Sequence, residues 1–167
     1  FHAHRADDIF TAIRIAKEFG LDYVIVHGTE GHLVADLLAQ ERARVITGPS
    51  LGDRGKPELA NVSFATPGIL NRAGVLCSIC TDHPETPLHY LPLCAALAVK
   101  SGMAEEEALR AITWYPARIV GLDHRVGSLA PGLDADLVLW SEHPLLLSAA
   151  VRAVVVQGKL AVGGGAR

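Results

Sequence analysis

Four polar residues of this 167-residue chain stand at or near the ends of short stretches with strand character. His2 and His4 belong to the opening FHAH, and alternate residues of a strand point to the same side. His27 follows LDYVIV, and Asp82 follows VLCSICT. Imidazole nitrogens and carboxylate oxygens are ligands that zinc, iron and manganese accept in proteins. If His2, His27 and Asp82 meet in the fold, they predict a divalent metal site, with zinc favoured over iron or manganese.

The segments between these residues alternate between strand and helix patterns. Strands are expected over 21–26, 44–47 and 75–81, and helices over 7–19, 31–43 and 66–72. Strands joined through helices must pair in parallel, as in α/β folds. The polar residues then stand at the carboxyl ends of the strands, the face that carries the active site of a (β/α)8 barrel.

The second half of the chain has a different pattern. Helices are expected over 92–100, 103–113 and 116–120, followed by short strands with hairpin signals over 136–140, 151–157 and 160–162. The glycine-rich end GGGAR is expected to fray, and it is no phosphate loop because no helix follows it.

Composition restricts the class of protein. Half of the residues are hydrophobic and 20% are charged, which excludes intrinsic disorder. The net charge of −3 gives no basic excess, so we expect no nucleic-acid partner. The chain has neither an apolar run of 18 residues nor a signal-peptide pattern, so we expect no membrane partner. Three cysteines without disulfide spacing favour a reducing compartment, the cytoplasm.

Three further histidines are candidates for contacting a small-molecule substrate. His4 follows His2 at strand spacing, His32 lies at the expected start of the helix after His27, and His83 is next to Asp82. Alternatives remain for three of the candidate residues. His4 could lie behind the metal ligands or face solvent, His27 could cap its strand, and Asp82 could cap the helix that follows.

The aperiodic segment 48–63 has the composition of a functional loop. It contains Arg54 and Lys56, and a cation over the barrel mouth could hold a substrate carboxylate. A surface role is an equal alternative for both. We take Arg54 as the candidate for binding substrate.

Cys77 and Cys80 form a CxxC pattern. Redox pairs of this kind stand at a helix start, whereas these cysteines lie inside an expected strand and point to opposite sides, so core packing is expected. An open flavodoxin-like sheet that binds a nucleotide is disfavoured, because no glycine-rich loop follows a strand.

Five motifs together resemble the C-terminal half of the amidohydrolase superfamily, near imidazolonepropionase and related cyclic-amide and dipeptide hydrolases. They are HAHRADDI, VIVHGTEGH, GPSLGDRGKPE, CTDHPETP and VGSLAPGLDADLVLW. The resemblance implies that His2 is the metal-binding histidine of the fifth barrel strand. It implies that His27 is the sixth-strand histidine, which binds a second metal in binuclear members and contacts the substrate in mononuclear ones. It implies that Asp82 is the eighth-strand aspartate, which binds metal and takes the proton of the attacking water. It further implies hydrolysis of C–N bonds in a cyclic amide or a peptide-like substrate.

The resemblance also implies a partial TIM-type barrel, strands five to eight, in residues 1–125, and the return to a small β-domain in residues 126–167. The family's first-strand His-X-His and fourth-strand lysine or glutamate have no counterpart. We therefore expect that a missing N-terminal half of the same protein completes the site, and that this chain alone has weak or no activity. A half-barrel exposes strand edges and apolar surface. The alternative is a non-catalytic half-barrel that forms a homo-oligomer through those edges.

Overall fold

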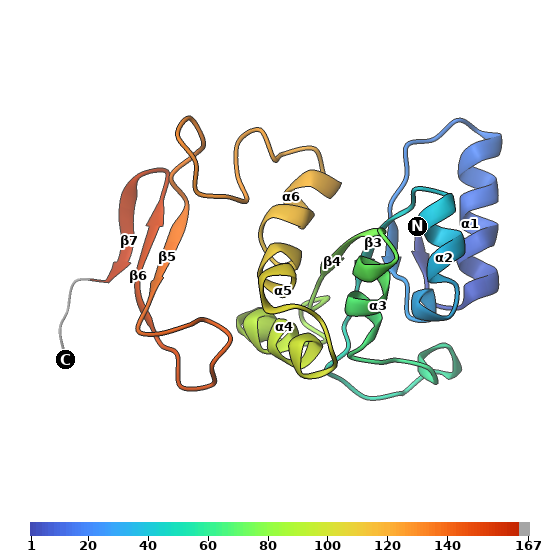
Figure 1. The fold of residues 1–167 in the computed structure, drawn as a ribbon, viewed down its shortest axis with the longest axis horizontal. Helices are drawn as coiled ribbons and strands as arrows, with labels where there is room; N and C mark the ends of the chain where they lie inside the picture. Colours follow the sequence, from blue (N-terminus) through green and yellow to red (C-terminus); the bar gives the residue numbers. More distant parts are fainter. Residues whose placement is uncertain (164–167) are drawn as a thin grey trace.

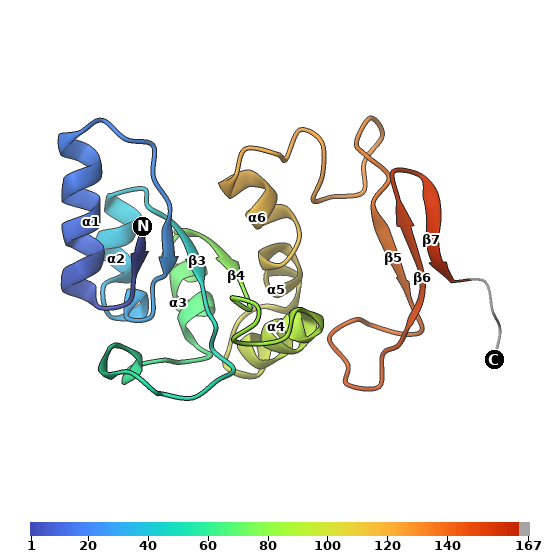
Figure 2. The same ribbon diagram turned by 180° about the vertical axis from the view of Figure 1, so that it is seen from behind.

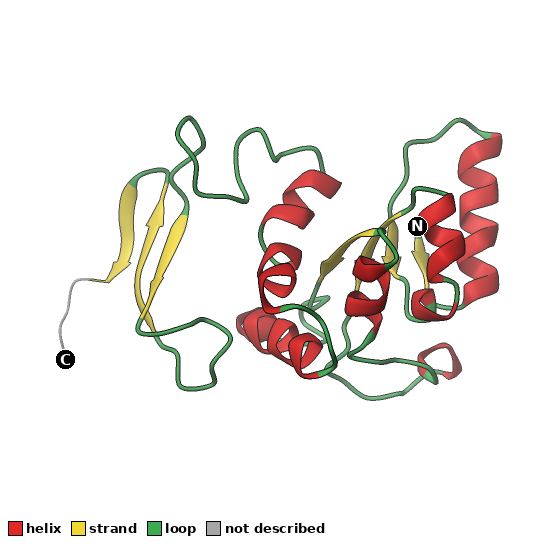
Figure 3. Cartoon of the chain, in the orientation of Figure 1, coloured by secondary structure: helices red, strands yellow, loops and turns green. Residues whose placement is uncertain are grey.

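The structure, a computed structural model, describes residues 1–163 as two separate sheets with helices between them (Figures 1 and 2). The glycine-rich end predicted to fray lies, beyond Gly163, outside the described residues. Figure 3 shows the two groups of strands on opposite sides of a helical layer. Among the described residues, no helix has the length and apolar character that crossing a bilayer requires.

The first sheet is parallel throughout, as the strand–helix alternation predicts. It has the order β1-β2-β3-β4, which is also the order along the chain. Its strands are β1 (His2–Ala3), β2 (Ile25–His27), β3 (Arg44–Thr47) and β4 (Leu76–Ile79). This order brings the carboxyl ends of β1 and β2 side by side, with Ala3 opposite His27 in the register.

Helices follow each of the first three strands and cover the sheet. They are α1 (Ala6–Glu18), α2 (Ala35–Gln40) and α3 (Thr66–Arg72), with the 3-10 helices η1 (Gly31–Leu33) and η2 (Pro57–Leu59) in the connections. One core unites helices and strands, and its fully buried members include Ile9, Ile13, Ile25, Leu38, Val45, Leu70 and Cys77.

Two predicted elements differ from the structure by more than about two residues at one end or in continuity. The expected strand 21–26 begins only at Ile25, because the chain is still closing the end of α1: Gly20 is left-handed, and the Leu21 backbone N–H donates to Ala16 at 2.8 Å. The expected helix 31–43 is divided into η1 and α2, because Val34 departs from helical geometry with φ −132° and ψ 25°.

The next helices separate the two sheets. They are η3 (Leu88–Tyr90), α4 (Leu91–Lys100), α5 (Glu105–Ala111) and α6 (Trp114–Ile119). They form a second core with the end of β4, built mainly from small side chains: Ile79, Cys94, Ala95, Ala98, Met103, Ala108 and Ala111. Small residues allow these short helices to approach one another closely.

The second sheet is antiparallel and consists of β5 (Leu137–Trp140), β6 (Val151–Val156) and β7 (Lys159–Gly163). Neighbours in a strand point to opposite faces, yet Val138 is 44% exposed and Leu139 55% exposed. In β7, Leu160 and Val162 are both 61% exposed. Apolar side chains thus remain exposed on both faces of this sheet.

Candidate functional site

Three imidazoles gather where β1 and β2 end. His2 Nδ1 lies 2.9 Å from His27 Nε2. The His4 ring stacks on the His27 ring, with centroids 4.4 Å apart and planes 9° from parallel. Residues 25 positions apart in the sequence are therefore in direct contact, as the predicted parallel pairing requires.

His27 has an unusual backbone that aims its side chain. Strand alternation would place it on the same face as Ile25, which is buried in the core against the helices. The extended conformation ends at His27 instead, with φ at 76°, a left-handed value that is uncommon outside glycine. The ring thereby reaches His2 and His4 while the residue stays 7% exposed.

The hydrogen bonds of His27 define its tautomer. Its Nδ1 lies 2.8 Å from the carbonyl oxygen of Gly48, and a carbonyl can only accept, so Nδ1 carries the proton and donates. In the neutral ring, Nε2 then has a free lone pair. That lone pair is directed at His2. If His2 Nδ1 is protonated, it donates a hydrogen bond to His27 Nε2; if it is not, the two nitrogens can bind one cation together.

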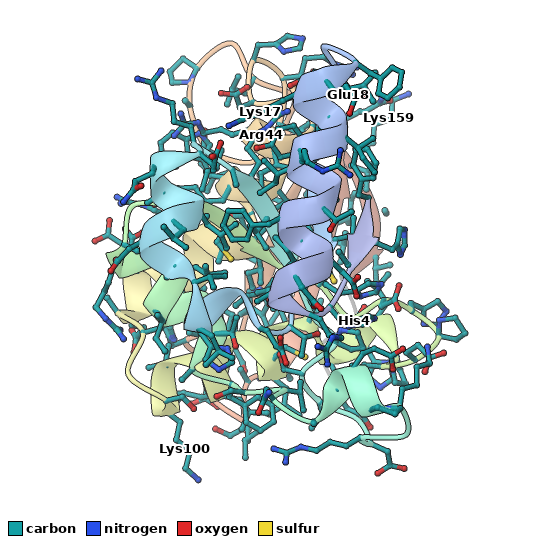
Figure 4. The ribbon with its side chains drawn as sticks, turned by 90° about the vertical axis from the view of Figure 1, so that its right-hand side faces the viewer. His4, Lys17, Glu18, Arg44, Lys100 and Lys159 are labelled. Carbon is teal, nitrogen blue, oxygen red and sulfur yellow. The ribbon has the colours of Figure 1, made fainter. Side chains whose placement is uncertain are left out.

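His4 is oriented by Thr29, whose Oγ1 lies 2.8 Å from His4 Nδ1. Burial is the main cause that lowers the pKa of His4, and His27 and the charge of Lys56 lower this pKa further. Neutral imidazole is therefore favoured at pH 7. Figure 4 shows His4 at the N-terminal end of α1, at the opposite end from Lys17 and Glu18.

A pocket of about 530 Å³ opens beside the imidazoles. Its lining includes His4, His27 and Asp82, so these three predicted site residues share one concave surface. Asp82 follows β4 after Cys80 and Thr81, and its backbone is also left-handed, with φ at 49°. His2 contacts His27 but is not part of the lining.

The segment 48–63 forms one wall of this pocket and is fixed at several points. The Asn61 side-chain amide donates to Glu30 Oε1 at 2.9 Å, and the Thr86 hydroxyl donates to the Leu51 carbonyl at 2.5 Å. Arg54 donates to the Val62 carbonyl at 3.2 Å, closing the loop on itself.

The donor set fits a divalent cation in part. His2 and His27 place two imidazole nitrogens close enough for one ion to touch both, and the Gly48 carbonyl fixes the His27 ring as carbonyls do for metal-ligating histidines. Over residues 1–163, however, no three His, Cys, Asp or Glu side chains come close enough together to hold a metal ion. Asp82 shares the pocket without joining the two nitrogens.

Comparison with known proteins decides the family. The sequence profile of the amidohydrolase family matches residues 2–161. The chain belongs to the amidohydrolase family. It is similar to amidohydrolase tasK of Hapsidospora irregularis, with 25% identity over 163 residues that make up 94% of this chain and 16% of the relative. It is also similar to imidazolonepropionase of Cereibacter sphaeroides (strain KD131 / KCTC 12085), with 42% identity over 83 residues, 47% of this chain and 21% of that protein.

A solved structure supports the fold of this amidohydrolase chain. The crystal structure of an amidohydrolase from Thermotoga maritima MSB8 has 45% sequence identity and a TM-score of 0.95, covering 98% of this chain and 43% of that one. The chain thus spans less than half of this solved relative and a smaller share of the curated ones. Its mixed α/β fold with a parallel sheet is confirmed, whereas the half-barrel and the boundary between residues 125 and 126 stay predictions.

Three predicted substrate contacts lie outside the pocket lining. His32 Nδ1 lies 2.9 Å from the Thr66 hydroxyl, and His83 is exposed. Arg54 is engaged with Val62. Sequence reasoning did not single out Asp53 and Glu85, which line the pocket. Asp53 lies in the motif GPSLGDRGKPE and Glu85 in CTDHPETP, so these motifs could have identified both residues as candidates.

Cys77 and Cys94 belong to the two cores, and Cys80 is half-buried. Burial raises the pKa of Cys77 to about 12 and that of Cys80 to about 11, so both thiols stay protonated at neutral pH. Cys77 belongs to the first core, as predicted. All three cysteines are free, and the cytoplasmic location stays a prediction.

Proposed function

We propose that this chain carries part of the active site of a metal-dependent hydrolase that cleaves C–N bonds in a cyclic amide or a peptide-like substrate. His2, His27 and Asp82 are its proposed ligands for a divalent metal, zinc before iron or manganese. The observation that carries the proposal is the bond from His27 Nδ1 to Gly48, because it leaves the Nε2 lone pair 2.9 Å from His2 Nδ1. The imidazolonepropionase relatives support C–N bonds as the target.

Each residue has a proposed task. A bound divalent cation would lower the pKa of a water and polarise the scissile carbonyl. Asp82 lines the pocket and would accept the proton of the attacking water, then pass it to the leaving nitrogen. His4, held by Thr29 and favoured in its neutral form, would contact the substrate. Left-handed backbones at His27 and Asp82 are the strained geometry that functional sites often retain.

We further propose that residues outside this chain complete the site, supplied by the N-terminal half of the same protein. The chain spans less than half of the solved Thermotoga relative. A cavity of about 1130 Å³ lies between the second sheet and the helices, lined mostly by apolar side chains that include Trp114, Leu129, Leu137 and Val154. The N-terminal half is the proposed occupant of this cavity. The alternative occupant is a second copy of this chain, which could also pack on the exposed faces of β5–β7.

Zinc titration of the 167-residue chain by calorimetry tests the ligand set. We expect stoichiometric binding that is lost in His27→Ala and Asp82→Ala. His124→Ala is the matched control, because His124 is exposed and far along the chain from the pocket. Binding that survives both pocket substitutions would contradict the ligand assignment. Light scattering separates the two occupants, because a monomer over the working concentrations argues against a second copy.

A chimera tests the reaction itself. This chain would replace the corresponding 43% of the Thermotoga amidohydrolase, with which it shares 45% identity. The chimera, screened on cyclic amides and dipeptides, is expected either to open the ring of a cyclic amide or to split a dipeptide into two amino acids. Asp82→Asn should lower its rate by about 10²- to 10⁴-fold, the usual contribution of a positioned acid–base group. A chimera that folds and binds zinc but cleaves neither class would refute the proposed reaction.

A further inference from the structure

Four charged side chains surround the pocket beside His4 and His27. They are Asp53, Lys56, Asp82 and Glu85. Across residues 1–163, none of the four enters an ion pair or a side-chain hydrogen bond, although eight salt bridges form elsewhere. Charges that the protein leaves without partners around a concave surface can bind the charges of a ligand.

Lys56 is the permanent cation of this pocket lining. It immediately precedes η2, and the Leu59 N–H donates to the Lys56 carbonyl at 3.0 Å, which fixes its backbone. Arg54, two residues earlier, is directed to the Val62 carbonyl and does not line the pocket. The two cations of this loop therefore differ in position: Arg54 holds the loop together, and Lys56 lines the pocket.

The carboxylates come from two sides of the pocket. Asp53 belongs to the same loop as Lys56, while Glu85 follows Asp82 in the turn after β4. With Asp82 assigned to metal and proton transfer, Asp53 and Glu85 remain to face the substrate. They would repel a second negative group and attract a positive one.

From this arrangement we propose that the substrate is a small zwitterion of dipeptide size, whose carboxylate is bound by Lys56 and whose ammonium group is bound by Asp53 and Glu85. The inference rests on the proposed function and narrows its substrate to the peptide-like class. The pocket volume of about 530 Å³ lies within the range of small-molecule sites. A neutral cyclic amide would use neither set of charges.

The test measures binding of glycylglycine by calorimetry or by NMR shifts of the 167-residue chain. N-acetyl-glycylglycine, which has lost the ammonium group, and glycylglycine amide, which has lost the carboxylate, are the comparison probes. Glycylglycine binding is measured in EDTA, so that it does not depend on bound metal. A lack of glycylglycine binding can then be distinguished from a lack of zinc binding in the titration. We expect glycylglycine to bind about tenfold more tightly than either capped form, the effect of one charge-assisted contact.

Two lysine substitutions provide the variant and its control. Lys56→Met should weaken glycylglycine binding about tenfold and leave binding of the amide unchanged. Lys100→Met removes the same charge from the exposed end of α4, outside the pocket lining, and should leave the binding of both probes unchanged. Lys56→Glu should make glycylglycine amide bind better than N-acetyl-glycylglycine, because the new carboxylate repels the carboxylate of the N-acetyl form. Equal weakening of glycylglycine binding by Lys56→Met and Lys100→Met would mean that the net charge of the chain attracts the probe, and it would overturn the proposal. N-acetyl-glycylglycine binding as tightly as glycylglycine, or no binding of glycylglycine, would also overturn it.

Discussion

The side-chain amide of Asn61 donates to Glu30 Oε1 at 2.9 Å, and the other oxygen of Glu30 accepts the backbone N–H of Ala6 at 2.8 Å. One carboxylate thus joins the start of α1, the turn after β2 and the loop 48–63. Since this loop forms a wall of the pocket, Glu30 couples the pocket wall to the parallel sheet.

Asn61→Ala is expected to release the loop without unfolding the chain. Asn61 is exposed, so the free energy of unfolding should change by no more than about 0.5 kcal/mol. Amide hydrogen exchange should become faster over residues 50–62 and stay unchanged in β3. Gln40→Ala, which removes an exposed side-chain amide at the end of α2, is the control. Equal exchange in wild type and Asn61→Ala would show that the tether does not hold the loop.

Glu107 predicts a pH dependence of stability. Its carboxylate accepts from Tyr115 at 2.5 Å, Asn71 at 2.7 Å and Arg110 at 2.7 Å, and these bonds, led by that of Tyr115, lower the pKa of Glu107. A lowered folded-state pKa means that the unfolded chain binds the proton more readily. The stabilisation is therefore complete above the ordinary carboxyl pKa and is lost as the pH falls through the lower folded-state value.

Glu107→Gln should accordingly lower the free energy of unfolding at pH 7, measured with urea, by about 1–3 kcal/mol, because it weakens hydrogen bonds to a charged acceptor. The difference from wild type should shrink below about pH 4, where the wild-type carboxyl begins to protonate in the unfolded chain. Glu106→Gln is the comparison, since the Glu106 side chain is 75% exposed and forms an ion pair with Arg110. A cost that stays constant from pH 7 to pH 3 would contradict this account.

Gly48 is expected to be irreplaceable. Its φ is 132°, and a Cβ there would lie 2.2 Å from the carbonyl oxygen of Cys80. Gly48→Ala would have to separate β3 from the end of β4 and would move the carbonyl that orients His27, so we expect a loss of about 3 kcal/mol or more. Gly20→Ala is the control, with φ at 62° but open space around it, and should cost about 1 kcal/mol. Similar urea midpoints for the two variants would contradict the close contact.

Some of this fold was predictable because its signals are local. Thr66 and Pro67 specify the start of α3, whose bounds match the prediction, and RVIT gives β3 its full length. The parallel order followed from the strand–helix alternation. The contact between His2 and His27 could be expected only as a consequence of that order, since no local pattern joins residues so far apart.

The details of the site required the structure. Arg54 and Lys56 carry the same charge within one aperiodic loop, and only the carbonyl of Val62 distinguishes them. The left-handed backbone of His27 depends on contacts of its ring with the Gly48 carbonyl and with His2, and both residues are distant from it in the sequence. Whether Asp82 joins a metal depends on groups that the described residues do not bring together.

The second sheet gives a prediction about solubility. Leu160 in β7 is 61% exposed, so Leu160→Lys removes little buried area and should change the free energy of unfolding by no more than about 0.5 kcal/mol. The same change places a charge on an exposed strand at the sheet edge, where charged residues oppose association. Light scattering should therefore show less self-association at high concentration. In the Thermotoga chimera, the buried charge should instead destabilise the assembled protein if this face packs against the remaining half. Leu160→Lys leaving the chimera as stable as its parent would show that β7 faces solvent in the whole protein too.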